Sequence, residues 1–333
     1  MVRAVAMYIG IDIGATNTRI ALADQEGRIV KKIRFPSPHE GDEYTVARLL
    51  VEKIRENFRD WLEKVRAVGI GTIGPVDLRK GMVVNSPNLG IRTFYLVGPL
   101  KEDLGKPVYM LNDCVAAVWG EKMFGAARDT DNAVYITFST GIGGGVIVDG
   151  ALLLGKDGNA HEIGHIVVDY KYRIRCGCGG YGHWEGYASG ANIPRFAQYI
   201  AEHEELSGEE KRSPLYRLAL EGRLTSEIIY REAKRCDPFA ERVVNEVIKI
   251  NVAGVASVIN VYDPEVVSIG GSVALNNPEL VIEPIIREVP KNIVNRAPRI
   301  LRTPLGEDAV IYGAIALAMN PPSTLLRFLQ KDA

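Results

Sequence analysis

The hydrophobic pattern at the start of the chain predicts a small antiparallel sheet. Apolar, β-branched runs occupy residues 8–14, 18–24 and 28–35, and short turns of glycine and polar residues separate them. Three short strands joined by tight turns are typical of an antiparallel meander. We therefore expect a three-stranded meander, which the run Pro36-Ser37-Pro38 brings to an end.

Helical and strand-like patterns alternate after the meander. Apolar residues recur on one face over residues 43–65, which predicts an amphipathic helix. Buried strands are expected at 67–73 and 108–111, and a helix is expected at 116–124. This alternation of strands and helices is typical of an α/β domain.

The second half of the chain shows a pattern of the same kind. Residues 133–139 and 145–148 predict a hairpin around a glycine-rich turn, and the longest helix is expected at about 238–261. A short apolar strand at 266–269 and a last helix that begins near Asp308 complete the pattern. Each half therefore opens with a β-hairpin and continues into helices.

This repetition predicts two similar α/β domains around a cleft. The division is expected near residues 112–116, with a smaller N-terminal domain of residues 1–113 and a larger domain of residues 114–313. Because no low-complexity linker lies there, we expect the hinge to be built from the ends of strands and helices.

The overall composition narrows the class of protein. Of the 333 residues, 40 are Lys or Arg and 41 are Asp or Glu, so the formal net charge is −1. That balance argues against a nucleic-acid-binding protein, which normally carries a basic patch or tail. The lead before Tyr8 is too short for a signal peptide, and no apolar run reaches about 18 residues. We therefore expect a soluble, cytoplasmic protein with no membrane span.

The first hairpin turn, from Asp12 to Arg19, has the composition of a phosphate-binding loop. Gly14 permits a tight turn and close approach of the backbone to a ligand. Thr16 and Asn17 supply short hydrogen-bond donors beside the N–H groups of the turn. Asp12 ends a strand and is well placed to hold Mg²⁺. An ordinary hairpin turn is the alternative explanation.

The second hairpin turn contains more glycine than a hairpin needs. It includes Thr140, Gly141 and Gly143, with glycine also at the next two positions. The run fails the dinucleotide-binding fingerprint, because Val146 stands where the last glycine of that pattern belongs. A nearby approximation to the Walker motif ends in Asp157 instead of Ser or Thr, so we expect only a loop there.

A third glycine turn, Gly270 and Gly271, follows the strand predicted at 266–269. Small residues at this point leave room for the flat face of an adenosine. Together with the two candidate phosphate loops, this turn is a candidate part of a nucleotide site.

Histidines and cysteines gather in one segment of the second half. Thiolate and imidazole groups suit tetrahedral Zn²⁺, and glycines between the ligands let a loop fold around an ion. We expect a closed structural zinc site made by His165, Cys176, Cys178 and His183. His161 is the rival first ligand, and a glycine-rich surface loop with incidental His and Cys is the alternative to a metal site.

Asn112 and Asp113 follow the strand predicted at 108–111 and precede a helix. An aspartate at such a place is often only a helix N-cap. A carboxylate at the carboxyl end of a strand, near a domain junction, is also where the base of a cleft enzyme belongs. The local pattern leaves both explanations of Asp113 open.

Taken together, these segments resemble the ROK family (repressors, open reading frames and kinases) over nearly the whole chain. The first loop is similar to the family's Asp-x-Gly-x-Thr phosphate motif, and Thr140–Gly145 is similar to its second phosphate motif. Asn85–Leu89 and Leu111–Asp113 resemble its sugar-binding segments. The most specific match is Glu162-Ile163-Gly164-His165, followed by Cys-Gly-Cys-Gly-x-x-Gly.

The resemblance implies an actin-like, hexokinase-like (ribonuclease H-like) pair of α/β domains, with a C-terminal helix of about 314–333 returning to the first domain. It implies ATP- and Mg²⁺-dependent phosphorylation of the 6-hydroxyl group of glucose or a similar hexose, with Asp113 as the catalytic base. A homodimer or homotetramer is also expected. The residues that the resemblance implies for sugar binding are Asn88, Asn112, Asp113, Glu162, His165 and Glu185.

One departure and three alternatives accompany this resemblance. The family usually has a third Cys where this chain has His183, although histidine is an acceptable zinc ligand. A kinase for fructose, mannose or an N-acetylhexosamine is an alternative, because the family shares its hydroxyl-reading residues. A sugar-sensing repressor would need an N-terminal helix-turn-helix, for which we expect no room before Asp12. An actin-like structural ATPase would lack the His–Cys segment.

Overall fold

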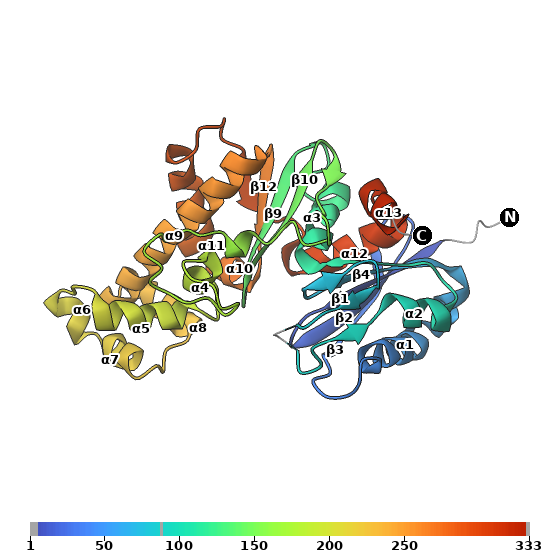
Figure 1. Cartoon of the computed structure of the whole chain (residues 1–333), viewed down its shortest axis with the longest axis horizontal. Coiled ribbons are helices and arrows are strands. Elements are labelled where there is room, and N and C mark those ends of the chain that lie inside the picture. The colour runs from blue at the N-terminus through green and yellow to red at the C-terminus, as the bar shows by residue number, and fades with distance from the viewer. Residues whose placement is uncertain (1–5, 87–88, 331–333) are drawn as a thin grey trace. The chain divides into compact units, whose positions relative to one another are not determined.

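The computed structural model describes residues 6–86 and 89–330. The chain divides into two compact units, each of which contains strands and helices (Figure 1). The first unit contains Met1–Tyr135, Gly145–His161 and Thr303–Ala333, and the second contains Ile136–Gly144 and Glu162–Arg302. The α/β class predicted from the sequence is confirmed.

The main sheet of the first unit begins with the predicted meander. Its strand order is β3-β2-β1-β4-β8, with β1, β2 and β3 antiparallel and β1, β4 and β8 parallel (Figure 1). Burial alternates along β3, as expected of an edge strand with one face toward solvent, whereas β1 is almost wholly buried. The strands are β1 Met7–Ile13, β2 Asn17–Ala23, β3 Ile29–Pro36, β4 Val65–Thr72 and β8 Val108–Asn112.

Helices and short strands complete the first unit. The helix predicted over 43–65 ends as an α-helix at Phe58 and continues to Lys64 as a tighter 3₁₀ helix. The helices are α1 Thr45–Phe58, η1 Arg59–Lys64, α2 Val97–Leu104, α3 Asp113–Phe124, η4 Gly306–Asp308, α12 Ala309–Met319 and α13 Ser323–Gln330. Short strands β5 Val76–Asp77, β6 Met82–Val83 and β7 Phe94–Tyr95 pair with one another, and β11 Ala151–Leu152 pairs with β10 Ile142–Val148.

The C-terminal part of the chain returns to the first unit, as the resemblance implied. Ile311 and Ile315 of α12 are fully buried and form one core cluster with Ala21 and Ala23 of β2. The predicted single helix is broken, however, because α12 ends at Met319 and α13 begins at Ser323. Pro321 and Pro322 lie in the break, and proline disfavours helical continuation on both sides of itself.

Helix α3 packs tightly on α12 within the first unit. A Cβ atom at Gly313 would lie 1.9 Å from the carbonyl oxygen of Ala116, so only glycine permits this approach of the two backbones. The compact unit therefore includes α3 and extends to Tyr135, whereas the sequence placed the division after residue 113. The sequence predicted a first domain of residues 1–113 with 314–333, and a second domain of residues 114–313. These domain boundaries stay a prediction.

The second main sheet has the order β11-β10-β9-β12-β13. Its remaining strands are β9 Ala133–Phe138, β12 Val266–Gly270 and β13 Arg299–Arg302. The division between the units falls inside β9 and β10, so that the turn joining these two strands belongs to the second unit. Parallel pairing of β12 with β13 follows the helical connection between them.

The rest of the second unit is helical, and α9 is its longest element (Figure 1). Trp184 of α4 is fully buried and donates from its indole N–H to the Asn251 side chain of α9, at 2.8 Å, so α9 supports the segment that carries the candidate metal ligands. The helices are η2 Ile163–His165, α4 Trp184–Ala188, α5 Ile193–His203, α6 Gly208–Arg212, α7 Pro214–Leu220, α8 Ser226–Ala233, α9 Pro238–Tyr262, α10 Ser272–Asn276, α11 Pro278–Glu288 and η3 Val289–Lys291.

By length and composition alone, α9 would suffice to cross a membrane, and the bent pair formed by Gly306–Met319 and Ser323–Gln330 passes the same test. In α9, 61% of the apolar window is buried inside the protein. That burial is typical of the core helix of a folded domain.

Candidate active site and metal centre

Two acidic residues with predicted roles, Asp12 and Asp113, lie at the carboxyl ends of parallel strands in the first unit, at one edge of the sheet. Asp12 of β1 is in register with Gly71 of β4, and Gly71 is in register with Leu111 of β8. Asn112 and Asp113 come directly after Leu111. Because neighbouring strands lie about 4.8 Å apart, the backbones at Asp12 and Leu111 are separated by about 10 Å. Ligands of open α/β sheets bind beyond this edge.

Asp12 is buried and forms an ion pair with Arg19 of the adjacent strand β2. The Arg19 Nε donates to Asp12 Oδ2 at 2.8 Å, and Arg19 Nη1 donates to the Glu307 carbonyl and to Asp308 Oδ1. Burial raises the pKa of the Asp12 carboxyl, and the guanidinium group opposes that rise. Arg19 therefore connects the candidate Mg²⁺ ligand to the C-terminal segment, a link that local sequence pattern did not reveal.

The first loop is a tight turn held by local hydrogen bonds. Gly14 donates its N–H to the Asn17 carbonyl at 3.0 Å, and the Ser37 hydroxyl donates to the Gly14 carbonyl at 2.7 Å. Ser37 also donates its N–H to the Thr16 carbonyl, so the chain after β3 fixes the turn between β1 and β2. The predicted residues Asp12, Gly14, Thr16 and Asn17 thus share one rigid corner.

Asp113 is the first residue of α3, and Asn112 occupies the N-cap position. The Asn112 side chain accepts the Cys114 N–H at 2.9 Å, and Asp113 Oδ1 lies 2.8 Å from the same nitrogen. Asn112 and Asp113 therefore both accept this N–H at the start of α3, so the cap and base explanations of Asp113 both stay open. Asp113 is partly exposed at the sheet edge, as a base that must reach a substrate requires.

The second loop turns earlier than the sequence indicated. Strand β10 begins at Ile142, so the turn itself comprises Ser139, Thr140 and Gly141, and Gly143 already lies in the strand. Gly145 serves packing, because a Cβ atom there would lie 2.2 Å from the carbonyl oxygen of Cys114 in α3. Thr140 is exposed, which leaves the tip of the turn accessible.

The third glycine turn stands beside the second loop. Gly270 ends β12, and Gly271 adopts a φ of 86°, which favours glycine. The hydroxyl groups of Ser139 and Ser272 lie 3.2 Å apart, so the second loop and the candidate adenosine segment touch. The structure thus brings these two predicted parts of a nucleotide site together within the second unit.

The sugar-binding residues implied by the resemblance fall in both units. Asn112 and Asp113 lie at the sheet edge of the first unit, and Asn88 lies outside the described residues. In the second unit, Glu162 Oε2 is 3.6 Å from His165 Nε2. Glu185, in the first turn of α4, accepts the backbone N–H of Ile142 through Oε2 at 2.9 Å.

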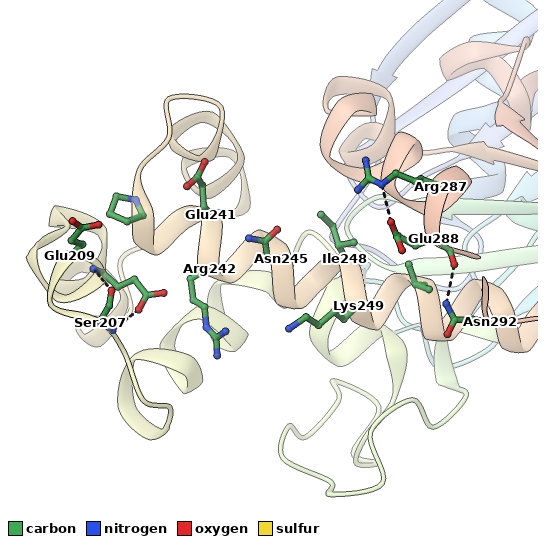
Figure 2. A pocket seen from close by; sticks show the side chains of 13 residues that line it. Ser207, Glu209, Glu241, Arg242, Asn245, Ile248, Lys249, Arg287, Glu288 and Asn292 are labelled. Carbon is green, nitrogen blue, oxygen red and sulfur yellow. Dashed lines mark hydrogen bonds and ion pairs between the residues drawn. The ribbon is translucent and has the colours of Figure 1, made fainter. Parts of the chain in front are cut away.

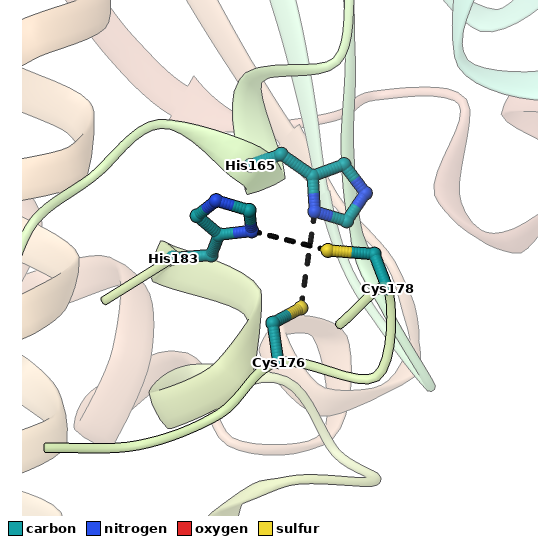
Figure 3. A group of neighbouring side chains, drawn as sticks. All are labelled: His165, Cys176, Cys178 and His183. Atoms are coloured by element: carbon teal, nitrogen blue, oxygen red, sulfur yellow. Dashed lines mark hydrogen bonds between the residues drawn. The ribbon is translucent and has the colours of Figure 1, made fainter. Parts of the chain in front are cut away.

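The four predicted metal ligands converge (Figure 3). His165 Nδ1 is 3.8 Å from Cys176 Sγ, His183 Nδ1 is 3.2 Å from Cys178 Sγ, and all four ligand atoms lie within 4.8 Å of one another. Ligand atoms around a tetrahedral zinc ion are separated by about 3.3–3.8 Å, given bonds of about 2.0–2.3 Å. His161, the rival ligand, instead contacts the Gly158 carbonyl at 3.2 Å.

Burial shifts the pKa values of two residues of this group. Burial raises the pKa of the Cys176 thiol to about 11, so a metal that binds the thiolate must displace its proton. Burial and the neighbouring His165 lower the pKa of His183, which favours the neutral imidazole that a metal requires. Donor types and spacing therefore fit zinc, and so does the neutral His183, whereas the raised pKa of Cys176 opposes formation of the thiolate.

Hydrogen bonds to the buried Asp169 support the loop between the metal ligands His165 and Cys176. Sequence reasoning did not predict these bonds. The Asp169 carboxylate accepts from the Tyr187 hydroxyl at 2.6 Å and from Arg173 Nε at 2.9 Å. Arg173 also pairs with Glu204 at the end of α5. Despite burial, the hydrogen bonds from Tyr187 and Arg173 hold the pKa of Asp169 below its usual range.

A hollow of the second unit lies elsewhere, along α9 (Figure 2). It encloses about 870 Å³, and it is lined by charged and polar side chains such as Glu241, Arg242 and Lys249. Ser207, the N-cap of helix α6, and Glu209 of that helix line its far end. Its lining includes none of the predicted site residues that the structure describes.

Comparison with known proteins places the chain in a family. Residues 8–320 match the ROK family. A glucokinase of Pyrobaculum calidifontis is 43% identical over 97% of this chain and 98% of its own length. The structure of a ROK hexokinase from Thermus thermophilus has a TM-score of 0.79 at 33% identity and covers 94% of this chain and 97% of its own.

A second solved structure contains bound ligands. A ROK glucokinase from Streptomyces griseus, in complex with glucose and AMPPNP, has a TM-score of 0.72 at 32% identity and covers 94% of this chain and 99% of its own. The family match over residues 8–320 includes residues of both compact units and all the candidate motifs. This chain belongs to the ROK family.

Proposed function

We propose that this protein is an ATP-dependent glucokinase or broad-specificity hexokinase that phosphorylates the 6-hydroxyl group of glucose. The observation that carries the proposal is the position of Asp113 at the carboxyl end of β8, in a chain whose relatives include glucokinases.

In the proposed reaction Asp113 accepts the proton of the 6-hydroxyl group as the oxygen attacks the γ-phosphorus of ATP. A bond forms between that oxygen and phosphorus, and the bond from phosphorus to the β,γ-bridging oxygen breaks, so ADP leaves. Phosphoryl transfer depends mostly on positioning and on charge stabilisation. The turns at Gly14 and Gly141 are suited to supply backbone N–H groups for the phosphates.

Asp12 is the candidate ligand for Mg²⁺. Bound Mg²⁺ neutralises the charge that develops on the phosphates and is usually held through one or two carboxylates and several waters. Arg19 holds the Asp12 carboxylate in one orientation, and Asp308 shares the charge of Arg19. In this account Arg19 orients Asp12 and takes no direct part in the transfer.

The zinc site would act through structure. His165, Cys176, Cys178 and His183 would hold the ion, which ties the loop that carries Glu162 and Glu185 to one shape. Glu162, His165 and Glu185 would then present carboxylate and imidazole groups to the sugar hydroxyls. Each buried polar group left unpaired by a wrong sugar costs about 1–3 kcal/mol, which is the basis of discrimination.

The proposal leaves the sugar range to experiment. A kinase for another hexose such as fructose, mannose or an N-acetylhexosamine would use the same base and phosphate loops. A sugar-sensing repressor is the alternative of another class, and a protein of that class would have no need of a base at Asp113. A cytoplasmic location and assembly into a homodimer or homotetramer stay predictions.

The test is ADP release with Mg²⁺ and ATP across glucose, mannose, fructose, glucosamine, N-acetylglucosamine and N-acetylmannosamine. We expect the highest kcat/KM with glucose. Comparable rates with several sugars would define a broad-specificity hexokinase. Absence of ADP release with every sugar, from protein that is folded and loaded with zinc, would refute the kinase assignment.

A further inference from the structure

Glu185 makes its shortest described contact with the second phosphate loop. Its Oε2 accepts the backbone N–H of Ile142 at 2.9 Å, directly after the turn residue Gly141. A Cβ atom at Gly141 would lie 2.6 Å from the same oxygen, so the carboxylate rests against the backbone of the turn. A sugar contact alone does not require this arrangement.

The segment that follows Glu185 also binds the same turn. Gly190 donates its N–H to the Ser139 carbonyl at 2.8 Å, and Ala191 donates to the Thr140 carbonyl at 3.1 Å. On the other side, a Cβ atom at Gly164 would lie 2.1 Å from the Ile142 carbonyl oxygen, so η2 packs on the start of β10. Residues that precede the ligand His165 and residues that follow the ligand His183 therefore both contact the second phosphate loop.

The second oxygen of Glu185 faces the metal group. Glu185 Oε1 lies 3.9 Å from Cys176 Sγ, and Glu185 stands two residues after the ligand His183. One carboxylate therefore touches a metal ligand through one oxygen and the phosphate loop through the other.

We propose that Glu185 is a positioning residue for ATP: by holding the N–H of Ile142, it fixes the peptide orientation of the turn that binds the phosphates. Hydrogen bonds to charged groups are roughly twice as strong as neutral ones, so the carboxylate is a firm anchor for this turn. The zinc loop thereby sets the affinity for nucleotide as well as for sugar. This inference rests on the proposed function, because it assigns ATP to the second loop.

The experiment measures binding of the ATP analogue AMPPNP, with Mg²⁺ and without sugar, to the zinc-loaded protein by calorimetry. We expect Glu185→Ala to weaken binding about tenfold, the effect of losing roughly 1.4 kcal/mol. Glu185→Gln keeps an oxygen that accepts the Ile142 N–H, so we expect it to bind AMPPNP within about threefold of the wild type, a factor below 1 kcal/mol. Glu185→Met, which keeps the length without an acceptor, replaces the alanine variant if that variant does not fold.

Glu162→Ala is the matched control, because Glu162 also belongs to the proposed sugar site but faces His165. We expect this control to weaken glucose binding and to leave AMPPNP binding unchanged. Glu185→Ala that binds AMPPNP as tightly as the wild type, while folded and loaded with zinc, would overturn the inference alone. Wild-type protein that binds no AMPPNP would overturn the proposed function and the inference with it.

Discussion

Asp12 and Asp113 of the first unit stand at the ends of buried parallel strands, whereas the candidate residues of the second unit lie on loops around the His–Cys group. The strand-end carboxylates are fixed by register and by direct partners such as Arg19. The loop residues depend on longer connections, through Glu185, Asp169 and the four metal ligands. We infer that the strand-end carboxylates Asp12 and Asp113 govern turnover more than affinity, and that the loop residues around the His–Cys group govern affinity more than turnover.

The largest effect is expected at Asp113. Asp113→Asn removes the base but keeps the shape of the side chain, so turnover should fall by about 10²–10⁴-fold while glucose binding changes little. ADP release gives the turnover, and calorimetry gives the glucose affinity. Asp103→Asn is the control, because Asp103 is an exposed carboxylate of the same unit that pairs only with Arg55 in the described contacts. Undiminished turnover of Asp113→Asn would remove Asp113 from its role.

A smaller loss of turnover is expected at Asp12. Asp12→Asn removes the charge that faces Arg19 and the proposed Mg²⁺, so kcat should fall at least about tenfold, or roughly 1.4 kcal/mol, and more Mg²⁺ should be needed for half-maximal rate. Titration of the rate with Mg²⁺ measures both changes. Asp308→Asn also loses a contact with Arg19 but should keep the Mg²⁺ dependence of the wild type. An unaltered Mg²⁺ requirement in Asp12→Asn would contradict the assignment.

The metal group should change affinity more than turnover. We expect about one zinc ion per chain by elemental analysis, and Cys178→Ala should lose it because a closed site needs all four ligands. The KM for glucose should then rise by about tenfold, since the loop bearing Glu162 and His165 loses its shape, and kcat should fall less.

Cys236→Ala is the control for this experiment, because Cys236 is exposed and lies outside the group of four ligands. It should keep both the zinc and the KM. A Cys178→Ala protein that retains a full complement of zinc would show that the group is not the metal site. A large fall in kcat at unchanged KM would contradict the division between turnover and affinity.

The smallest effect is expected at Asp169, and it concerns stability. Asp169→Asn weakens the hydrogen bonds from Tyr187 and Arg173, at a cost of about 1–3 kcal/mol. Tm should fall by several degrees, at roughly 2–4 °C per kcal/mol for a chain of this size. Thermal unfolding at neutral pH measures the difference, and Tyr187→Phe should reproduce part of it.

The pH dependence of that difference follows from the lowered pKa of Asp169. The unfolded carboxyl titrates near pH 4, and the folded one titrates lower, so the stabilisation is complete above about pH 4 and is lost as the pH falls through the folded pKa. The gap in Tm between the wild type and Asp169→Asn should therefore be constant between pH 6 and 8 and shrink below about pH 4. A difference in Tm that grows on acidification would contradict an ionised Asp169 in the folded protein.

Much of the fold follows from local pattern. Apolar, β-branched runs at 8–14, 18–24 and 28–35, separated by short turns, located the meander, and helical periodicity located α1. The two-residue strands β5, β6 and β7 escaped prediction because such short strands display no period. The break between α12 and α13 had a local signal in Pro321 and Pro322, which the expectation of a single helix overlooked.

The candidate site was predictable where residue type alone signals chemistry. His and Cys in one glycine-rich segment identified the four converging ligands, because few other roles explain that composition. The contacts of Glu185 with Ile142 and of Asp169 with Tyr187 were missed, since they join positions 43 and 18 residues apart that only the fold brings together. The packing of Gly145 against α3 was missed for the same reason, because its neighbour Cys114 is distant in sequence.

The central claim is that this protein transfers a phosphoryl group from ATP to the 6-hydroxyl group of glucose. The most direct measurement is ³¹P NMR of a reaction that contains wild-type protein, Mg²⁺, ATP and glucose. The account predicts equal amounts of ADP and glucose 6-phosphate, and at most about 1% as much of each product with Asp113→Asn over the same initial period. ATP that stays intact with folded, zinc-loaded wild-type protein, or a phosphate on another hydroxyl group, would contradict it.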